Sequence, residues 1–457
     1  MKMLKSFFKS IVIIFITSST LFANTVYVTN NNGNTVSAID TVTDTVMATI
    51  TVGTAPLFLA VTPDGTKVYV ANQLSNNISV IDTATNTVIT TIPVGLTPQS
   101  IAITPDGTRA YVAIENSDTV SVIDIASNTV IANILVGTGP LFLAITPDGT
   151  KVYVINSFSS NISVISTLTN TVIATIPLGG GSFPAFLVIT PDGTKVYVIS
   201  DSDDDVDVIS TVTDTVIATV TVGSDPVFAA VTPDGLKVYV TNIGSSTVSV
   251  INTVTDTVIA TIPVGANPRF PLVTPDGTKV YVTNFVGNNV SVISTALDIV
   301  IDTTPTDVNS SFSVSTPDGS KIYVSNFGAN SVSVINGVTN ALLVNLPVGP
   351  GPLFFVITPT LVESPMNLNA RLVKQQFLTQ TDLVNIVTWN APLNGFPPVL
   401  YLVYRNAALT DLAGVVPANR ELVFEDHNRK KNTLYAYYVV SVAANGGFSV
   451  PNTVIID

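Results

Sequence analysis

Short runs of β-branched and aromatic residues alternate with turn residues through most of the chain. One unit of the pattern holds four such runs, at residues 58–61, 67–70, 78–81 and 88–92. Val, Ile, Thr and Tyr dominate the runs, as a pleated surface prefers. Pro-Asp-Gly and Asn-rich pairs separate them, because Pro presets φ and Gly accepts a positive φ. The second run is continuously apolar, which indicates a strand buried on both faces.

The unit recurs at a nearly fixed spacing, marked by the motif Thr-Pro-Asp-Gly. The step between copies is 42 residues, with one step of 44, and the motif begins at Thr62, Thr104, Thr146, Thr190, Thr232, Thr274 and Thr316. A degenerate copy begins at Thr358. Four antiparallel strands in a unit of this length are typical of a propeller blade.

The two ends of the repeat array complement each other. The first copy, from Thr25, lacks the first strand of the unit, and the last copy, at residues 353–357, is only that first strand. Together they predict one composite blade, which closes a ring and removes the exposed edges that an open array would leave. Counting this blade, we predict an all-β protein whose main domain, residues 24–362, is an eight-bladed β-propeller.

Several of these motifs resemble a known repeat family. Tyr69-Val70-Ala71-Asn72, Tyr239-Val240-Thr241-Asn242 and Tyr281-Val282-Thr283-Asn284, with the Thr-Pro-Asp-Gly turns, are similar to the YVTN β-propeller repeat over residues 24 to about 360. The resemblance implies a propeller of an exported bacterial or archaeal protein, often at the cell surface. The family is often seven-bladed, so seven is the alternative blade count.

The N-terminus has the pattern of an export signal. Three lysines precede a short apolar stretch that starts at residues 11–16, and cleavage after Ala23 fits the small residues that follow. The stretch is short for a transmembrane helix, and no later segment is long and apolar enough to span a bilayer. We therefore interpret residues 1–23 as a signal peptide, and expect a mature protein without a membrane span that is secreted, periplasmic or on the cell surface.

Composition shifts after Pro359, where Lys, Arg and Glu become common and the single Trp occurs. Runs at residues 387–389, 400–405 and 435–439 predict strands. Residues 363–457 resemble a fibronectin type III domain, a β-sandwich. That resemblance implies that Trp389 is the core tryptophan and Tyr435 the tyrosine of the penultimate strand. Modules of this kind on exported bacterial proteins usually act as spacers or attachment arms.

Charge and composition narrow the function. The chain has 31 acidic and 18 basic residues, which disfavours nucleic acid as a partner. It has no Cys, and its only histidine is His427, so the predicted propeller lacks the residues of a Ser-His-Asp triad, a haem ligand or a usual zinc site. We expect a non-enzymatic protein without a cofactor. The alternative is a calcium-dependent lactonase-type hydrolase at the channel, although Glu115 is the only Glu between residues 24 and 362.

One acidic cluster has residue types that could bind a metal ion. The cluster runs from Asp201 to Asp207 and offers oxygen ligands at alternating positions, which suits Ca²⁺, with Asp201, Asp203 and Asp205 as the candidate ligands. The cluster lacks the Gly and the closing Glu of an EF-hand loop. A weak Ca²⁺ site and a solvated turn both remain open.

The repeats differ mainly on one face of the predicted disc. Because strand direction alternates within a blade, the loops between second and third strands share a face with the links between blades, opposite the Thr-Pro-Asp-Gly turns. Three departures from the repeat fall there: Arg269 and Gln99 replace apolar residues, and Glu115 follows an Ile in place of Asn. Loops on a rigid scaffold usually carry function, so these three are the candidate ligand-binding residues.

The predicted partner of Arg269 is Glu115, an anionic group of a ligand, or water. A recurring Phe, such as Phe58 and Phe142, is expected in the core between blades rather than in an aromatic ligand ring. The sequence thus favours an exported binding or envelope scaffold protein whose partner is a protein or another envelope component.

Overall fold

The computed structural model describes residues 24–179 and 183–359 and seven segments of the C-terminal part, at 366–376, 381–390, 400–405, 412–417, 422–426, 435–442 and 452–456. The chain divides into two compact units, and Ala23–Leu361 forms one of them while Val362–Asp457 belongs to the other. The predicted signal peptide and His427 lie outside the described residues. No helix in the described part of the chain has the length and apolarity needed to cross a membrane.

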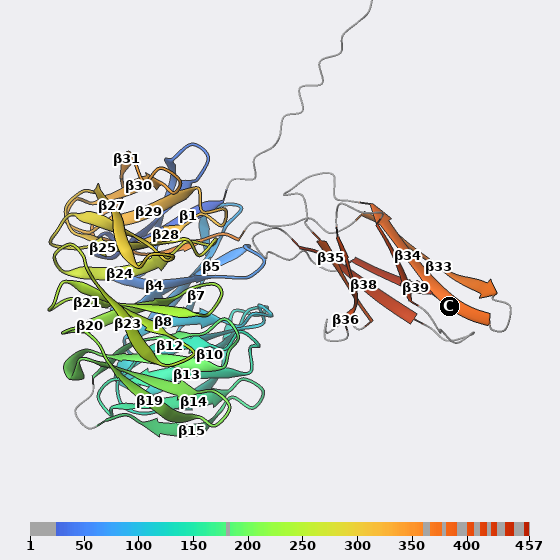
Figure 1. The fold of residues 1–457 in the computed structure, drawn as a ribbon, viewed down its shortest axis with the longest axis horizontal. Helices are drawn as coiled ribbons and strands as arrows, with labels where there is room; N and C mark the ends of the chain where they lie inside the picture. The colour runs from blue at the N-terminus through green and yellow to red at the C-terminus, as the bar shows by residue number, and fades with distance from the viewer. Residues whose placement is uncertain are drawn as a thin grey trace, which may run out of the picture. The chain divides into compact units, whose positions relative to one another are not determined.

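Eight four-stranded antiparallel sheets form a closed propeller (Figure 1). The predicted blade count of eight is therefore confirmed, and seven is wrong. The first strands of the blades line the axis: β32 (Pro352–Ile357), β4 (Pro56–Val61), β8 (Pro98–Ile103), β12 (Pro140–Ile145), β16 (Pro184–Ile189), β20 (Pro226–Val231), β24 (Pro268–Val273) and β28 (Ser310–Ser315). We number the blades in this order, from the first, which contains β32, to the eighth, which contains β28.

The second strands are the most deeply buried. They are β1 (Thr25–Asn30), β5 (Lys67–Asn72), β9 (Arg109–Ile114), β13 (Lys151–Asn156), β17 (Lys195–Ser200), β21 (Lys237–Asn242), β25 (Lys279–Asn284) and β29 (Lys321–Asn326). In each of them the last five residues are buried, including a fully buried Tyr. The continuous apolar run thus reports burial on both faces, as predicted.

The third and fourth strands complete each blade outward. The third strands are β2 (Thr35–Asp40), β6 (Asn77–Asp82), β10 (Thr119–Asp124), β14 (Asn161–Ser166), β18 (Asp205–Ser210), β22 (Thr247–Asn252), β26 (Asn289–Ser294) and β30 (Ser331–Asn336). The fourth strands are β3 (Thr45–Thr51), β7 (Thr87–Pro93), β11 (Thr129–Leu135), β15 (Thr171–Pro177), β19 (Thr215–Thr221), β23 (Thr257–Pro263), β27 (Ile299–Pro305) and β31 (Leu342–Pro347). Three 3-10 turns, η1 (Asn31–Gly33), η2 (Glu115–Ser117) and η3 (Asp201–Asp203), join second and third strands.

The first blade closes the ring with strands from both ends of the repeat array. Its order is β3-β2-β1-β32, with Tyr27 opposite Val356. Thr358 donates its backbone N–H to the carbonyl of Thr25 at 2.9 Å, and its hydroxyl accepts the N–H of Thr25 at 2.8 Å. In Figure 1 the blue β1 accordingly lies beside the orange strands of the eighth blade. The predicted composite blade is confirmed.

The Thr-Pro-Asp-Gly motifs form the turns between first and second strands. In the second blade the hydroxyl of Thr62 donates to Asp64 at 2.5 Å, and the N–H of Gly65 donates to the carbonyl of Thr62 at 2.8 Å. Gly65 has φ = 69°, which a residue with a side chain rarely adopts. The motif therefore forms a turn that is stabilised by hydrogen bonds among its own residues.

The described part of the C-terminal unit contains two small antiparallel sheets. One has the order β33-β34-β37 and the other β36-β35-β38-β39. The strands are β33 (Met366–Gln376), β34 (Thr381–Asn390), β35 (Leu400–Tyr404), β36 (Leu412–Pro417), β37 (Val423–Asp426), β38 (Tyr435–Val442) and β39 (Asn452–Ile456). Trp389, Tyr401 and Tyr437 belong to one hydrophobic cluster shared by both sheets. The buried tyrosine of β38 is thus Tyr437, whereas the side chain of Tyr435 lies outside the described residues.

Candidate functional site

The two faces of the propeller differ in what their polar residues do. We call the face with the Thr-Pro-Asp-Gly turns the turn face, and the face with the links and the second-to-third loops the link face. On the turn face, the buried Tyr of each blade donates its hydroxyl to an Asn or Asp of the next blade: Tyr27 to Asn86, Tyr69 to Asn128, Tyr111 to Asn170, Tyr153 to Asp214, Tyr197 to Asp256, Tyr239 to Asp298, Tyr281 to Asn340 and Tyr323 to Asp44.

These acceptors satisfy two demands at once. Each lies in the turn between third and fourth strands with φ between 51° and 60°, the left-handed region that Asn and Asp tolerate best among side-chain-bearing residues. Each also closes a blade-to-blade contact, which we call a latch. Burial raises the pKa of all eight tyrosines, that of Tyr281 to about 12. The hydroxyls therefore remain donors at neutral pH.

The cations that follow the turns join the same latches. Each donates to a backbone carbonyl of the next blade: Lys67 to Ile125, Arg109 to Thr167, Lys151 to Thr211, Lys195 to Thr253, Lys237 to Thr295, Lys279 to Gly337 and Lys321 to Thr41. Four of them also form 2.7 Å ion pairs with the latch Asp. The described cations of this face are thus engaged in holding blades together.

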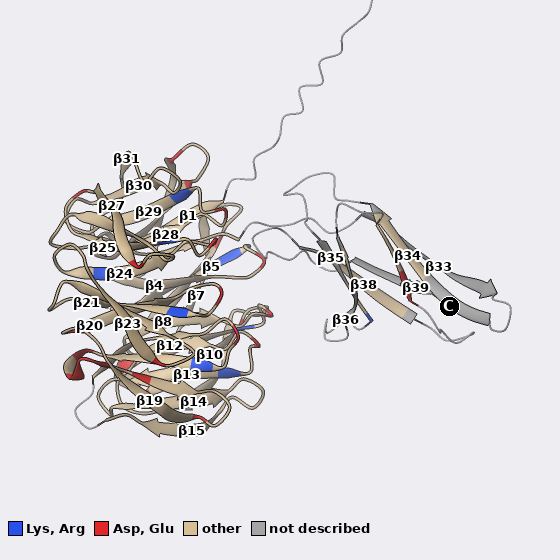
Figure 2. Cartoon of the chain, viewed as in Figure 1, with Lys and Arg blue, Asp and Glu red and all other residues tan. Residues whose placement is uncertain are grey.

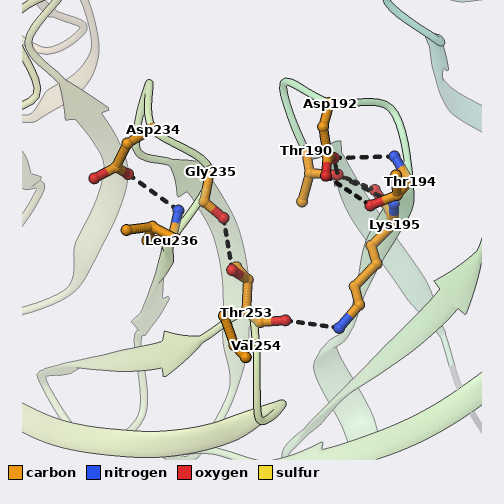
Figure 3. Close-up of a pocket in the computed structure, with 9 residues that line it drawn as sticks. All are labelled: Thr190, Asp192, Thr194, Lys195, Asp234, Gly235, Leu236, Thr253 and Val254. Atoms are coloured by element: carbon orange, nitrogen blue, oxygen red, sulfur yellow. Dashed lines mark hydrogen bonds between the residues drawn. The ribbon is translucent and has the colours of Figure 1, made fainter.

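A hollow of about 310 Å³ lies between two neighbouring turns of this face (Figure 3). Lys195 crosses it to donate to the carbonyl of Thr253 at 2.6 Å, and the hydroxyl of Thr253 donates to the carbonyl of Gly235 at 2.6 Å. The hydroxyl of Thr190 and the N–H of Thr194 lower the pKa of Asp192. The polar groups around this hollow are already paired, so it offers a ligand little.

A cluster of phenylalanines lies around the propeller axis. Seven rings, one from each first strand except that of the third blade, contact one another in a closed circuit with centroids 3.7 to 5.9 Å apart: Phe58, Phe142, Phe186, Phe228, Phe270, Phe312 and Phe354. The Phe58–Phe142 pair spans the third blade, where Ser100 stands instead. These rings thus pack between blades, as expected, and their contacts continue around the axis.

The hollow beside this cluster is apolar. It measures about 240 Å³, and Ser313 is its only polar lining side chain. A lactonase-type calcium site would need carboxylate and amide oxygens. No carboxylate or amide side chain occurs among the residues that the structure places around this hollow. Candidate metal-binding side chains of the propeller therefore lie elsewhere.

On the link face, Gln99 and Glu115 are brought together. Gln99, at the start of β8, is buried, and its amide donates to the carboxylate of Glu115 in η2. Both belong to the third blade. The buried amide of Gln99 is thus satisfied by Glu115, so this pair requires no external partner.

Arg269 lies in the seventh blade, four places around a ring of eight from the third. Its Nε donates to Asn267 at 3.1 Å, and its guanidinium lies 4.8 Å from the ring centroid of Phe285. No ion pair joins Arg269 to Glu115 in the described structure. The two Nη groups make no hydrogen bond to any described residue. Burial lowers the pKa of this guanidinium, which shows that its surroundings disfavour an unpaired charge.

The acidic cluster of the fifth blade is split by its local structure. Asp201 and Asp203 lie in the exposed turn η3, whereas Asp205 begins β18 and is half-buried. This run is the extended red stretch beside β19 in Figure 2. Asp207, which ends the predicted cluster but is not among its three candidate ligands, is buried with 4% exposure. The repeat itself distinguishes this residue, because the other blades have Ser at the equivalent position.

Nothing in the described structure places three or more His, Asp or Glu side chains together around a point that could hold a metal. The alternating trio Asp201, Asp203 and Asp205 is therefore not a preformed ligand set. The prediction of weak Ca²⁺ binding by these residues stays a prediction.

Comparisons with known proteins agree on the fold. Hydrazine synthase of Kuenenia stuttgartiensis is 25% identical with a TM-score of 0.52, covering 62% of this chain and 95% of that chain. The dihydro-heme d1 dehydrogenase NirN in complex with DHE is 16% identical with a TM-score of 0.63, covering 73% and 75%. A functionally unknown protein of Desulfotomaculum acetoxidans DSM 771 is 17% identical with a TM-score of 0.51, covering 73% and 98%.

No curated protein matches the chain by sequence. A family model does match residues 12–116, a segment that includes the second blade and most of the first. By sequence, this N-terminal segment is similar to the YNCE-like β-propellers.

Proposed function

We propose that the chain is an exported, non-enzymatic binding or envelope scaffold protein that recognises its partner on the link face of the propeller. The observation that carries the proposal is the different use of cations on the two faces. Seven of the eight Lys and Arg residues of the repeat region donate to the next blade on the turn face. The eighth, Arg269, lies on the link face and keeps both Nη groups for another molecule.

The surroundings of Arg269 favour an anionic group as its partner. Asn267 accepts a hydrogen bond from Nε of Arg269, and the ring of Phe285 lies against one face of the guanidinium. These two contacts order the guanidinium before any ligand binds. A partly desolvated guanidinium gains from a carboxylate or phosphate oxygen that it can bind with two donors. The proposed partner is a protein or another envelope component that presents such a group.

The C-terminal unit is proposed to be a fibronectin type III-like sandwich that acts as a spacer or attachment arm. Its two sheets share a core around Trp389, and such sandwiches bury a Trp between the sheets. The buried carboxylate of Asp426 accepts hydrogen bonds from Tyr437 at 2.8 Å and from Arg405 at 3.0 and 3.1 Å. These contacts support a stable module, and the arm role is a proposal by resemblance.

The proposal is tested by capture of envelope components on the immobilised protein. We expect Arg269→Ala to reduce the capture of a specific component at least tenfold, with a melting temperature within about 2 °C of the wild type because Arg269 makes no interblade bond. Arg269→Lys should recover the capture only in part, since an ammonium lacks the planar pair of donors. The control, Lys67→Met, should lower stability slightly and leave the capture unchanged.

Equal losses of capture in Arg269→Ala and Lys67→Met would contradict the assignment to the link face. Hydrolysis of a lactone panel by the purified wild type, absent from a mock purification, would contradict the non-enzymatic proposal.

A further inference from the structure

Six blades share a buried amide beneath the link face. At the end of the second strand an Asn donates its Nδ2 to the side-chain oxygens of two third-strand residues, and in the second blade Asn72 donates to Asn77 at 2.8 Å and to Ser79 at 2.9 Å. The same arrangement occurs at Asn30, Asn156, Asn242, Asn284 and Asn326. In these blades a nitrogen donor therefore lies between two oxygens, neither of them charged.

The fifth blade replaces all three members of this arrangement. Ser200 stands for the Asn, while Asp205 and Asp207 stand for the two oxygen-bearing residues. Ser200 lies opposite Asp205 in the β17–β18 pairing, and Asp207 lies two residues further along β18, so the three side chains share one face of the sheet. A Ser side chain is too short to reach the place that the amide nitrogen takes in the other blades.

Two oxygens of this group lack a hydrogen-bond donor. Ser200 is fully buried, and neither its Oγ nor the Oδ1 of Asp205 has a hydrogen-bond partner among the described residues. Asp207 is 4% exposed and accepts one hydrogen bond, from Thr219 at 2.6 Å. Burial, and then the charge of Asp207, raise the pKa of Asp205 to about 6. No described Lys or Arg pairs with either carboxylate, so the group is short of positive charge.

Ordinary drift of the repeat does not produce this combination. In the third blade Ile114 replaces the Asn, and its two opposing residues, Thr119 and Ser121, stay neutral. Only in the fifth blade does loss of the donor coincide with two added carboxylates. The link that leads into this blade also carries the two-residue insertion of the repeat.

We propose that Ser200, Asp205 and Asp207 bind one Ca²⁺ ion, which takes the place of the amide donor of the other blades. Two carboxylates neutralise a divalent ion, and a hydroxyl and waters complete an all-oxygen shell of the kind that Ca²⁺ accepts without strict geometry. Asp203, in the adjacent turn, adds negative charge near the carboxylates. The ion fixes η3 on the link face. This inference does not depend on the proposed function.

The experiment is a calcium titration of the purified full-length protein at pH 7.5 after treatment with a chelator and dialysis. We expect calorimetry with CaCl₂ to give one site per chain with a dissociation constant of about 0.1–1 mM, as in extracellular modules. A saturating concentration should raise the melting temperature by a few degrees. MgCl₂ at the same concentration should have a smaller effect, because Mg²⁺ demands octahedral geometry.

Two variants decide whether this pocket holds the ion. The triple variant Ser200→Asn, Asp205→Asn, Asp207→Ser restores the amide arrangement of the other blades, so it should fold, and it should lose the calcium heat and the calcium-dependent stabilisation. The control Asp201→Asn removes one charge from the exposed turn and should keep both. The proposal is overturned if the wild type shows no stoichiometric heat, if the triple variant still binds, or if Asp201→Asn abolishes binding.

Discussion

The latch at Asp256 is suited to a mutational test of the contacts between blades. Asp256 of the sixth blade accepts hydrogen bonds from Lys195 and Tyr197 of the fifth blade, both at 2.7 Å. The side chains of Lys195 and Asp256 are 21% and 14% exposed, so the pair is largely desolvated. Asp256 also has φ = 51°. Substitution by Asn, Gly and Ala separates charge, hydrogen bonding and backbone conformation.

The expected free energies of unfolding follow from the sister latches. Asp256→Asn should cost only about 1 kcal/mol, because Asn340 accepts the same two donors in the eighth blade at 2.8 and 2.7 Å. Asp256→Gly keeps the backbone but leaves a buried hydroxyl and an ammonium without this acceptor, which should cost about 3 kcal/mol. Asp256→Ala adds about 1 kcal/mol for a left-handed conformation with a Cβ.

Equilibrium unfolding in guanidinium chloride, followed by circular dichroism, measures this series. The control Asp225→Asn makes the same chemical change at an exposed link position with φ = 52° and should be nearly neutral. If Asp256→Asn destabilises as much as Asp256→Ala, charge rather than hydrogen bonding dominates the latch. If all three variants stay within 0.5 kcal/mol (roughly the scatter of surface substitutions), the latch contributes nothing measurable.

Three further outcomes are expected. In the folded protein the pKa of the latch tyrosines lies above the unfolded value of 10.0. Above pH 10 the unfolded chain therefore releases protons first, and the free energy of unfolding falls by up to about 1.4 kcal/mol per pH unit for each latch Tyr, less where solvent screens the hydroxyl. Unfolding curves at pH 9 to 11.5 check this. Truncation before Leu353 should destabilise the ring by removing the partner of β1, whereas truncation after Leu361 should not; thermal melting compares the two. Elemental analysis of the purified protein should return no stoichiometric iron, copper or zinc.

Much of the propeller follows from local patterns in the sequence. Apolar runs and Thr-Pro-Asp-Gly turns repeat in register, so the blade, the ring and the closing strand near Thr358 could all be predicted. The latch spans 59 residues from Tyr197 to Asp256, and a local pattern does not report such a pairing. Its signal is the recurrence of Asn or Asp before the fourth strand, a residue type needed both for the turn and as an acceptor.

The candidate site was harder to predict, because side-chain directions depend on local irregularities. A register shift between Pro56 and Leu59, repeated in the other first strands, decides which residues face the axis, and it turns Phe58 toward the other rings. The alternation of strand direction predicted that Arg269 and Glu115 lie on the same face, but it did not predict how far apart they lie around the ring. The positions of their blades, four apart in a ring of eight, exclude the direct ion pair.

The hydrogen bonds between Thr25 and Thr358 bear on the order in which the protein folds. In the other blades the corresponding partners, such as Thr62 and Lys67, are five residues apart, whereas Thr25 and Thr358 are separated by 333 residues. Loop-closure entropy grows with the logarithm of separation, so bringing the ends together costs roughly 4 kcal/mol more than forming an ordinary hairpin. Seven blades can assemble from neighbouring segments, and the first blade must wait for them. We therefore expect it to form last and open first, and a circular permutant with its ends at another turn should move that weak point to a different blade.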